Sequence, residues 1–283
     1  MSAILRRLSA FTRDPAAGNP AGVWIGDELP DRQEMQRIAA EVGYSETAFL
    51  APMQGLRRTV RYYSPLAEVT FCGHATIASG VVLGERDGEG TYVLETAAGE
   101  VPVRVTRDED GMLLAALTSV APRHEPVPEA VLSEALAAME LERDELDEGI
   151  GPARIFAGAW HLLVPLRSRQ RLARLRYDFP RLQKAMLDDD LTTVQVVWFE
   201  AGAFEVAHSR NPFPVGGVVE DPATGASAAA LGGYLRDTGR IQTPARFQIR
   251  QGEDMGRPSL LRVEVPAEGG VTVAGTAVEI PAG

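Results

Sequence analysis

The chain of 283 residues lacks several features that would assign it to a common class of protein. Its single cysteine excludes an internal disulfide, which fits a reducing compartment. Zinc-type spacing of cysteine and histidine is missing, and so is a phosphate-binding Gly-x-x-x-x-Gly-Lys pattern. The four histidines also lie far apart in the sequence. We therefore expect no metal cluster, and nothing in the sequence requires a cofactor.

Long apolar segments and clustered positive charge are also lacking. No stretch approaches the roughly 18 consecutive apolar residues that cross a bilayer. The segment Met1–Leu8 has neither the apolar core nor the cleavage site of a secretory signal. Lysine and arginine are scattered through a chain of net charge −11, so no nucleic-acid partner is expected. We expect a cytoplasmic protein that has no membrane partner.

The composition is that of a globular protein, with 45% hydrophobic and 24% charged residues. Its length suits two domains of ordinary size. Short strand patterns outnumber helical ones, so the expected fold class is α+β. One helix should begin at Asp31, with Glu34 completing a capping box, and end at Gly43. The acidic segment Glu140–Glu148 is expected to form a solvated surface helix.

The segment Glu220–Leu235 has two contrasting parts. Residues 220–225 form a polar turn, whereas residues 226–235 are almost all small or apolar. A helix with no polar face should be buried on all sides. Its first turn presents free backbone N–H groups, which attract a carboxylate or a developing oxyanion.

A second copy of this turn and helix lies in the first half of the chain. The turn Cys72-Gly73-His74 precedes another small, apolar run at residues 77–83. An arginine, a proline and the turn recur in the second half at the same separation in sequence. Arg210 repeats Arg61, Pro214 repeats Pro65, and Asp221 takes the place of Cys72. This repeat predicts a duplicated domain. We place the two halves at residues 1–120 and 121–270.

Five motifs together resemble the signatures of the PhzF-like (phenazine biosynthesis) family. They are Gly18–Ala21, Ser45–Phe49, Cys72–Thr76, Glu220–Gly225, and Gln251-Gly252 with Met255–Ser259. They occur in the family's order and span nearly the whole chain, so the set is specific although each motif alone is weak. The resemblance implies the diaminopimelate-epimerase-like fold. In that fold two pseudo-symmetric domains each wrap a curved sheet round a central buried helix, and the site lies between them. It also implies a homodimer, and a last strand near residues 271–283 that crosses back to the first domain.

The resemblance further assigns chemistry to three side chains. It implies that Glu46 is the general acid/base, although the pattern alone indicates a solvated glutamate at a sheet edge. His74 and Asp221 would support or relay the proton; each could instead be only a cap at its helix start. Cys72 could act as a thiolate base or be a small buried hydrophobic residue. A racemase that uses two thiols is excluded by the single cysteine.

Substrate binding is expected from the two turns and from Asn19, which could also be an ordinary turn residue. The amides of Gly73, His74, Gly225 and Ala226 would hold the anionic groups. The family continues its second motif with Thr-Gly-Ser, but this chain has Ala226 and then Ser227. The hydroxyl is thereby turned by about 100° round the helix. Ser227 completes the candidate binding residues.

We expect a cofactor-independent isomerase that moves a proton on a carbon next to a carbonyl or carboxyl group of a small anionic metabolite. One alternative is an epimerase or racemase of an amino-acid-like substrate, with Glu46 or Cys72 acting against Asp221. The other alternative is a non-catalytic, dimeric small-molecule-binding protein that keeps the fold.

Overall fold

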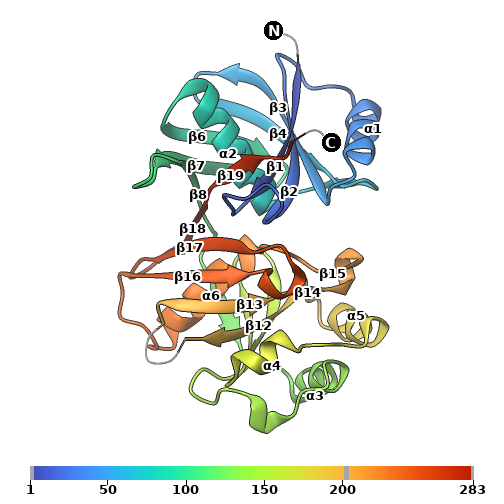
Figure 1. Cartoon of the computed structure of the whole chain (residues 1–283), viewed down its shortest axis with the longest axis vertical. Coiled ribbons are helices and arrows are strands. Elements are labelled where there is room, and N and C mark those ends of the chain that lie inside the picture. The colour runs from blue at the N-terminus through green and yellow to red at the C-terminus, as the bar shows by residue number, and fades with distance from the viewer. Residues whose placement is uncertain (1–2, 201–203, 282–283) are drawn as a thin grey trace. The chain divides into compact units, whose positions relative to one another are not determined.

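The computed structural model describes residues 3–200 and 204–281 (Figure 1). The chain divides into two compact units. Unit 1 comprises Met1–Thr118 and Ala274–Gly283, and unit 2 comprises Ser119–Val273. Each unit combines a sheet with helices, as the α+β prediction requires. No helix in the described part of the chain is long and apolar enough to span a bilayer.

Unit 1 surrounds one helix with strands and carries a second helix outside them. Its elements are β1 (Ile4–Ala10), β2 (Asn19–Ile25), α1 (Arg32–Val42), β3 (Glu46–Gln54), β4 (Arg57–Tyr63), β5 (Glu68–Val69), α2 (Gly73–Asp87), β6 (Gly90–Thr96), β7 (Gly99–Arg107), β8 (Leu113–Thr118) and β19 (Ala277–Glu279). Strand β1 is antiparallel to both β2 and β19. The sheet continues through parallel β2 and β3, antiparallel β3 and β4, parallel β4 and β6, and antiparallel β6, β7 and β8.

Unit 2 has a longer set of elements. They are β9 (Arg123–Glu125), α3 (Glu129–Ala138), η1 (Arg143–Glu145), β10 (Ala153–Phe156), β11 (Trp160–Pro165), α4 (Arg169–Ala173), α5 (Phe179–Asp188), β12 (Thr193–Phe199), β13 (Val206–Arg210), β14 (Pro212–Phe213), η2 (Pro214–Gly216), β15 (Val218–Glu220), α6 (Gly225–Asp237), β16 (Ala245–Gln251), η3 (Glu253–Met255), β17 (Ser259–Val265) and β18 (Thr272–Gly275), which runs across the unit boundary. Strands β14 and β15 form a separate two-stranded sheet.

The two units repeat one ladder pattern. In unit 1 the strands β1, β2, β3, β4, β6 and β7 pair in the order antiparallel, parallel, antiparallel, parallel, antiparallel. In unit 2 the strands β10, β11, β12, β13, β16 and β17 pair in the same order. Helices α2 and α6 occupy the same place in the two patterns. The pseudo-symmetric α+β fold predicted from the repeat is thus confirmed.

Helices α2 and α6 are the buried centres of their units, as their apolar sequences predict. Glycine allows them to approach the sheets closely. A Cβ atom on Gly80 of α2 would lie 2.7 Å from the Cβ of Ala115, and one on Gly232 of α6 would lie 3.0 Å from a methyl of Val265. Larger residues at these two positions would push each helix away from its sheet.

The outer faces of the sheets are covered by the remaining helices (Figure 1). Helix α1 buries Met35 and Ala39 against Trp24 and Phe49. Its ends follow the prediction, since Asp31 accepts a hydrogen bond from the Glu34 amide at 2.9 Å and Gly43 closes it in the left-handed conformation. In unit 2, helices α3, α4 and α5 cover Leu162, Val164, Val194 and Val196.

The predicted surface helix over Glu140–Glu148 is wrong. The segment contains only the short 3₁₀ turn η1. Glu140 adopts a positive φ of 52°, and Leu141 and Leu146 are buried in the core. These two leucines anchor the segment from the inside, and that tertiary packing outweighs the helix propensity of its charged residues.

Candidate active site

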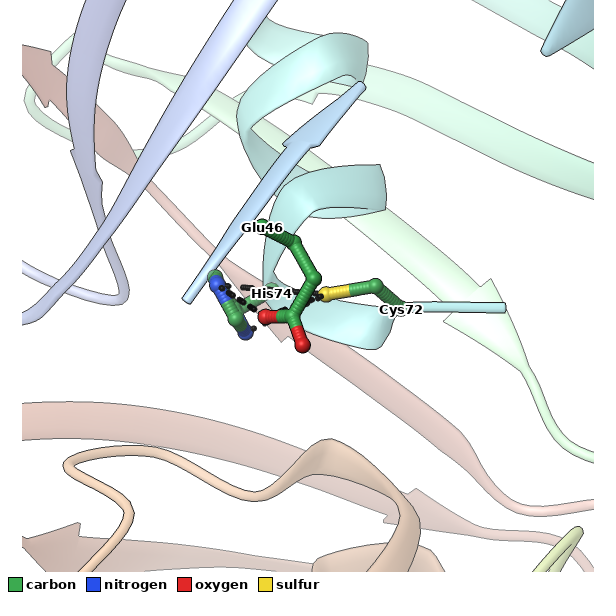
Figure 2. Close-up of side chains that lie close together, drawn as sticks. All are labelled: Glu46, Cys72 and His74. Atoms are coloured by element: carbon green, nitrogen blue, oxygen red, sulfur yellow. Dashed lines mark hydrogen bonds and ion pairs between the residues drawn. The ribbon is translucent and has the colours of Figure 1, made fainter. Parts of the chain in front are cut away.

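Glu46 is the first residue of β3, where it pairs with Ala21 of the parallel strand β2. Side chains alternate along a strand, so Glu46 shares a face with Ala48 and not with Phe49. Phe49 packs in the outer cluster with α1. The carboxylate of Glu46 therefore points to the inner face, toward the start of α2 (Figure 2).

The start of α2 is fixed by hydrogen bonds on its buried side, and Gly73 leaves space next to its backbone. Cys72 is its N-cap residue in extended conformation, and the Cys72 side chain makes no capping hydrogen bond. Beneath it, the Thr76 hydroxyl donates to the Cys72 carbonyl at 2.7 Å and lies 2.7 Å from the buried Tyr62 hydroxyl. A Cβ atom on Gly73 would meet nothing within 4 Å. The backbone of this turn can thus be approached closely by a ligand.

Glu46, Cys72 and His74 form a compact group at this helix start (Figure 2). The Oε2 atom of Glu46 lies 3.5 Å from Cys72 Sγ and 3.5 Å from His74 Nε2. Cys72 Sγ is 3.4 Å from His74 Nδ1, and the Ser45 hydroxyl is 3.4 Å from Nε2. Cys72 and His74 are buried, whereas the Glu46 side chain is 21% exposed.

This arrangement suits proton transfer between a ligand and the protein. The partly exposed Glu46 can meet a ligand, and the buried His74 imidazole, at 3.5 Å, needs only to approach by a few tenths of an ångström to exchange a proton with it. Cys72 touches both groups, which a purely hydrophobic role would not require. Glu46 is thus a partly buried residue with polar neighbours, and its acid/base role stays a prediction.

Asp221 lies in the equivalent turn of unit 2, within a dense hydrogen-bond network. Its Oδ2 accepts from the Thr224 hydroxyl at 2.6 Å, and its carbonyl accepts from Gln251 Nε2 at 2.7 Å. The Thr224 amide donates to Gln251 Oε1 at 3.2 Å. The next residue, Gly252, has a φ of 77°, and a Cβ atom there would lie 2.9 Å from the Pro222 carbonyl. The end of β16 therefore fixes the shape of the Asp221 turn.

The start of α6 resembles that of α2. Its N-cap residue, Thr224, makes no side-chain capping bond to the first turn, and Gly225 is buried while Ala226 is partly exposed. Ser227 is fully buried; its hydroxyl donates to the Thr224 carbonyl at 3.2 Å and accepts from Asn211 Nδ2 at 2.8 Å. The Ser227 hydroxyl thus bonds within unit 2, and its role in substrate binding stays a prediction.

A second polar layer lies beneath α6. Asn211 Nδ2 also donates to the Thr193 hydroxyl at 3.4 Å, which lies 2.8 Å from His161 Nδ1. His161 is completely buried, and its Nε2 atom has no hydrogen-bond partner among the described residues. Burial lowers the pKa of His161 to about 3, so the imidazole is neutral at physiological pH.

The candidate residues fall into one group in each unit. Unit 1 brings Glu46 and His74 together with Gly73. The buried Asn19 is two residues before the strand partner of Glu46, on the same face of β2. Unit 2 brings Asp221 together with Gly225, Ala226 and Ser227.

Three contacting residues were not singled out as site residues from the sequence: Ser45, Thr224 and Gln251. Each belongs to a motif that carried the family resemblance. The signal was therefore present as a pattern, but its partners depend on strand pairing and turn geometry.

Known proteins similar to this chain support its family assignment. Residues 8–283 match the PhzC-PhzF family, described as phenazine biosynthesis-like protein. An uncharacterized isomerase, YfhB, of Bacillus subtilis is 30% identical, covering 96% of this chain and 94% of that protein. The trans-2,3-dihydro-3-hydroxyanthranilate isomerase of Pseudomonas aeruginosa is 31% identical, covering 93% of this chain and 89% of that protein.

The fold of a solved relative agrees. A crystal structure of a PhzF-family phenazine biosynthesis protein from Bacillus anthracis superposes with a TM-score of 0.88 at 25% identity, covering 99% of this chain and 98% of that one. The resemblance and the epimerase-like fold expected from the sequence are confirmed, and so is the expectation of an isomerase-family enzyme. The chain therefore belongs to the PhzC-PhzF family of phenazine biosynthesis-like proteins.

Proposed function

We propose that this protein is a cofactor-independent isomerase that moves a proton on a small carboxylate substrate by general acid/base catalysis. The observation that carries the proposal is the position of Glu46. Its carboxylate lies 3.5 Å from the buried His74 imidazole, at the open start of the buried helix α2. A carboxylate that reaches both a ligand and a second proton acceptor is suited to act as a shuttle.

In this mechanism, the Glu46 carboxylate removes a proton from a carbon next to a carbonyl or carboxyl group. The electron pair of the broken C–H bond moves into an enolate. The amides of Gly73 and His74, at the start of α2 beside Glu46, stabilise such an anion, since helix starts offer unsatisfied N–H donors and a positive dipole end. The amides of Gly225 and Ala226 are the proposed anion-binding groups of unit 2. In a substrate with an adjacent carbon–carbon double bond, the enolate extends over that bond, and protonated Glu46 returns its proton to the far carbon while the double bond shifts. His74 and Asp221 support this transfer, and Asn19 and Ser227 support the binding residues.

The substrate is proposed to be a small anionic metabolite with an acidic C–H bond. Backbone amides at the two helix starts are its proposed anion-binding groups, which suits a carboxylate. We also infer a cytoplasmic homodimer, a state for which family membership is the support. Analytical ultracentrifugation of the purified protein will measure the dimer.

Deuterium uptake tests the reaction without a known substrate. The protein is incubated in deuterated water with a panel of amino acids and small carboxylates, and mass spectrometry measures the label. We expect uptake that falls by about 100-fold or more in Glu46→Gln, the effect of losing a general base. Glu68→Gln is the matched control, because Glu68 is in the same unit with a similarly exposed side chain of 24%.

Each outcome decides between the candidate functions. Undiminished uptake in a folded Glu46→Gln variant would refute the assignment of Glu46. Thermal-shift binding of some panel compounds without any uptake would instead favour a non-catalytic binding protein.

A further inference from the structure

The group at the start of α2 contains three different kinds of metal ligand. Glu46 offers a carboxylate oxygen, Cys72 a thiol sulfur and His74 an imidazole nitrogen. No metal cluster was expected because the four histidines are far apart in sequence. This group needs only one histidine, because the other two ligands are a carboxylate and a thiol. Strand β3 and the α2 turn bring the donors together (Figure 2).

We propose that Glu46, Cys72 and His74 form a binding site for a zinc-like divalent ion, and that the bound ion inhibits the enzyme. The inhibitory part rests on the function proposed above, since the ion would occupy the carboxylate of Glu46. The binding part rests on the geometry alone.

The distances between the donors match the edges of a zinc tetrahedron. With Zn–S near 2.3 Å and Zn–N and Zn–O near 2.0–2.1 Å, tetrahedral angles place sulfur about 3.6 Å from nitrogen or oxygen, and nitrogen about 3.4 Å from oxygen. In the structure, Cys72 Sγ lies 3.5 Å from Glu46 Oε2 and 3.8 Å from His74 Nε2. The Nε2 and Oε2 atoms are 3.5 Å apart. The three donors are therefore spaced for an ion, provided that the imidazole also turns to aim a nitrogen at it.

The one adjustment needed is a rotation of the imidazole. Both nitrogens of His74 lie close to the sulfur, at 3.4 and 3.8 Å, so the ring presents its face rather than a lone pair. Turning the ring about its Cβ–Cγ bond aims a nitrogen at the ion. The Ser45 hydroxyl lies 3.4 Å from Nε2, and Ser45 is an exposed residue. The rotation replaces this contact with a bond between the imidazole and the metal.

The donor set selects for zinc over the common hard cations. Thiolate and imidazole suit zinc, whereas magnesium and calcium prefer oxygen ligands. Binding converts the Cys72 thiol to a thiolate and releases its proton to the solvent. A water molecule or a substrate oxygen would complete the coordination, because three protein ligands leave one tetrahedral position open. With Glu46 bound to the ion, its carboxylate can no longer accept a substrate proton.

Cobalt(II) titration tests the binding site directly. Full-length protein is treated with a chelator, and cobalt(II) is added as a coloured substitute for zinc. We expect sulfur-to-cobalt charge-transfer absorption that saturates at one equivalent and disappears in Cys72→Ser. Glu46→Gln and His74→Asn each remove a direct ligand of the ion. Loss of an outer-sphere group costs roughly 10–100-fold in metal affinity, so these two variants should lose more than that. His124→Asn, which alters an exposed histidine in unit 2, should leave the titration unchanged.

Absence of charge-transfer absorption in the wild-type protein would overturn the site, and so would absorption that persists in Cys72→Ser. The wild-type spectrum decides the question even if a variant folds poorly. A second measurement follows deuterium exchange with zinc and then with chelator. Inhibition that the chelator reverses is expected, and full exchange in the zinc-saturated protein would overturn the inhibitory role. A protein without exchange in either condition would refute the proposed reaction, while the cobalt spectrum would still decide the metal site.

Discussion

Thr193 occupies in unit 2 the ladder position that Glu46 occupies in unit 1. Each residue opens the parallel ladder of its unit, Glu46 opposite Ala21 and Thr193 opposite His161. Each also points to the face of the buried central helix. The duplicated halves therefore differ in chemistry at this point, since the threonine hydroxyl does not ionise near neutral pH, whereas a carboxyl group does.

The register of the next ladder gives the same correspondence. Phe49 pairs with Arg61, and Val196 pairs with Arg210, the arginine that repeats Arg61. Glu46 lies three positions before Phe49, and Thr193 lies three positions before Val196. An epimerase built on two symmetric carboxylates would need an acid in both halves. This ladder position offers an acid in unit 1 alone, so an epimerase would have to draw its second acid from another position, such as Asp221.

Cys72→Ser separates the shuttle from an epimerase that uses the thiol. If Glu46 carries the proton, this variant should keep deuterium exchange within about threefold of wild type, because serine preserves the volume of the side chain. His74→Asn should lower exchange by about 10-fold to 100-fold, since it removes the group that Glu46 contacts at 3.5 Å. Near-complete loss of exchange in Cys72→Ser would instead support the epimerase.

Gln251 should be a positioning residue for Asp221. Gln251→Ala removes hydrogen bonds to the Asp221 carbonyl and to the Thr224 amide. We expect the maximal exchange rate to fall about tenfold with a smaller change in the half-saturating substrate concentration, and the free energy of unfolding to fall by about 1–3 kcal/mol. Gln248→Ala is the control, because Gln248 lies on the exposed face of the same strand. Equal kinetics in the two variants would refute the positioning role.

Arg210 and Glu220 form a buried ion pair that should dominate the stability of the second turn. Their side chains are only 11% and 4% exposed, and Arg210 also donates to the carbonyls of Leu172 and Leu175. Arg210→Met leaves a buried uncompensated charge and should cost about 3–5 kcal/mol in urea unfolding. The double variant with Glu220→Leu should recover part of this loss. Arg246→Met, at a side chain that is 82% exposed, should cost less than about 1 kcal/mol.

His161 should make the protein sensitive to mild acid. Its folded pKa is about 3, whereas an unfolded histidine titrates near pH 6.5. Between these values only the unfolded chain binds the proton, so stability is retained above pH 6.5 and lost as the pH falls toward 3. The loss is about 1.4 kcal/mol per pH unit, or about 2 kcal/mol at pH 5.

Urea unfolding at several pH values measures this effect. His161→Leu should flatten the dependence between pH 6.5 and 5, while His124→Asn, at an exposed site, should keep the wild-type slope. A wild-type slope that survives in His161→Leu would show that other groups cause the acid sensitivity.

The parts of the fold that the sequence predicted are those with local signals. The ends of helix α1 are predicted by its capping residues, Asp31 and Gly43. Helices α2 and α6 are predicted by their apolar composition and by the repeat. The Glu140–Glu148 segment was predicted wrongly because the burial of Leu141 and Leu146 depends on distant elements.

The candidate site shows the same division. The family motifs pointed to Glu46 and His74, but not to their contact with Cys72. That contact depends on the register of β3 against β2 and on how the α2 turn meets them. The hydrogen bond between Gln251 and Asp221 likewise forms only because β16 ends beside the Asp221 turn, although helix α6 separates the two in sequence.

The pairing of β19 with β1 has a consequence for the order in which a ribosome lets this protein fold. Ala277–Glu279 supplies one neighbour of β1, with Ala10 opposite Ala277 and Leu8 opposite Glu279. Unit 1 is therefore completed only after residues 277–279 have been synthesised, although residues 3–118 are made before unit 2. Unit 2 is continuous from Ser119 to Val273 and can assemble before residues 277–279 emerge from the ribosome. The unit that carries Glu46 is thus completed after unit 2, although its first strands are made earlier.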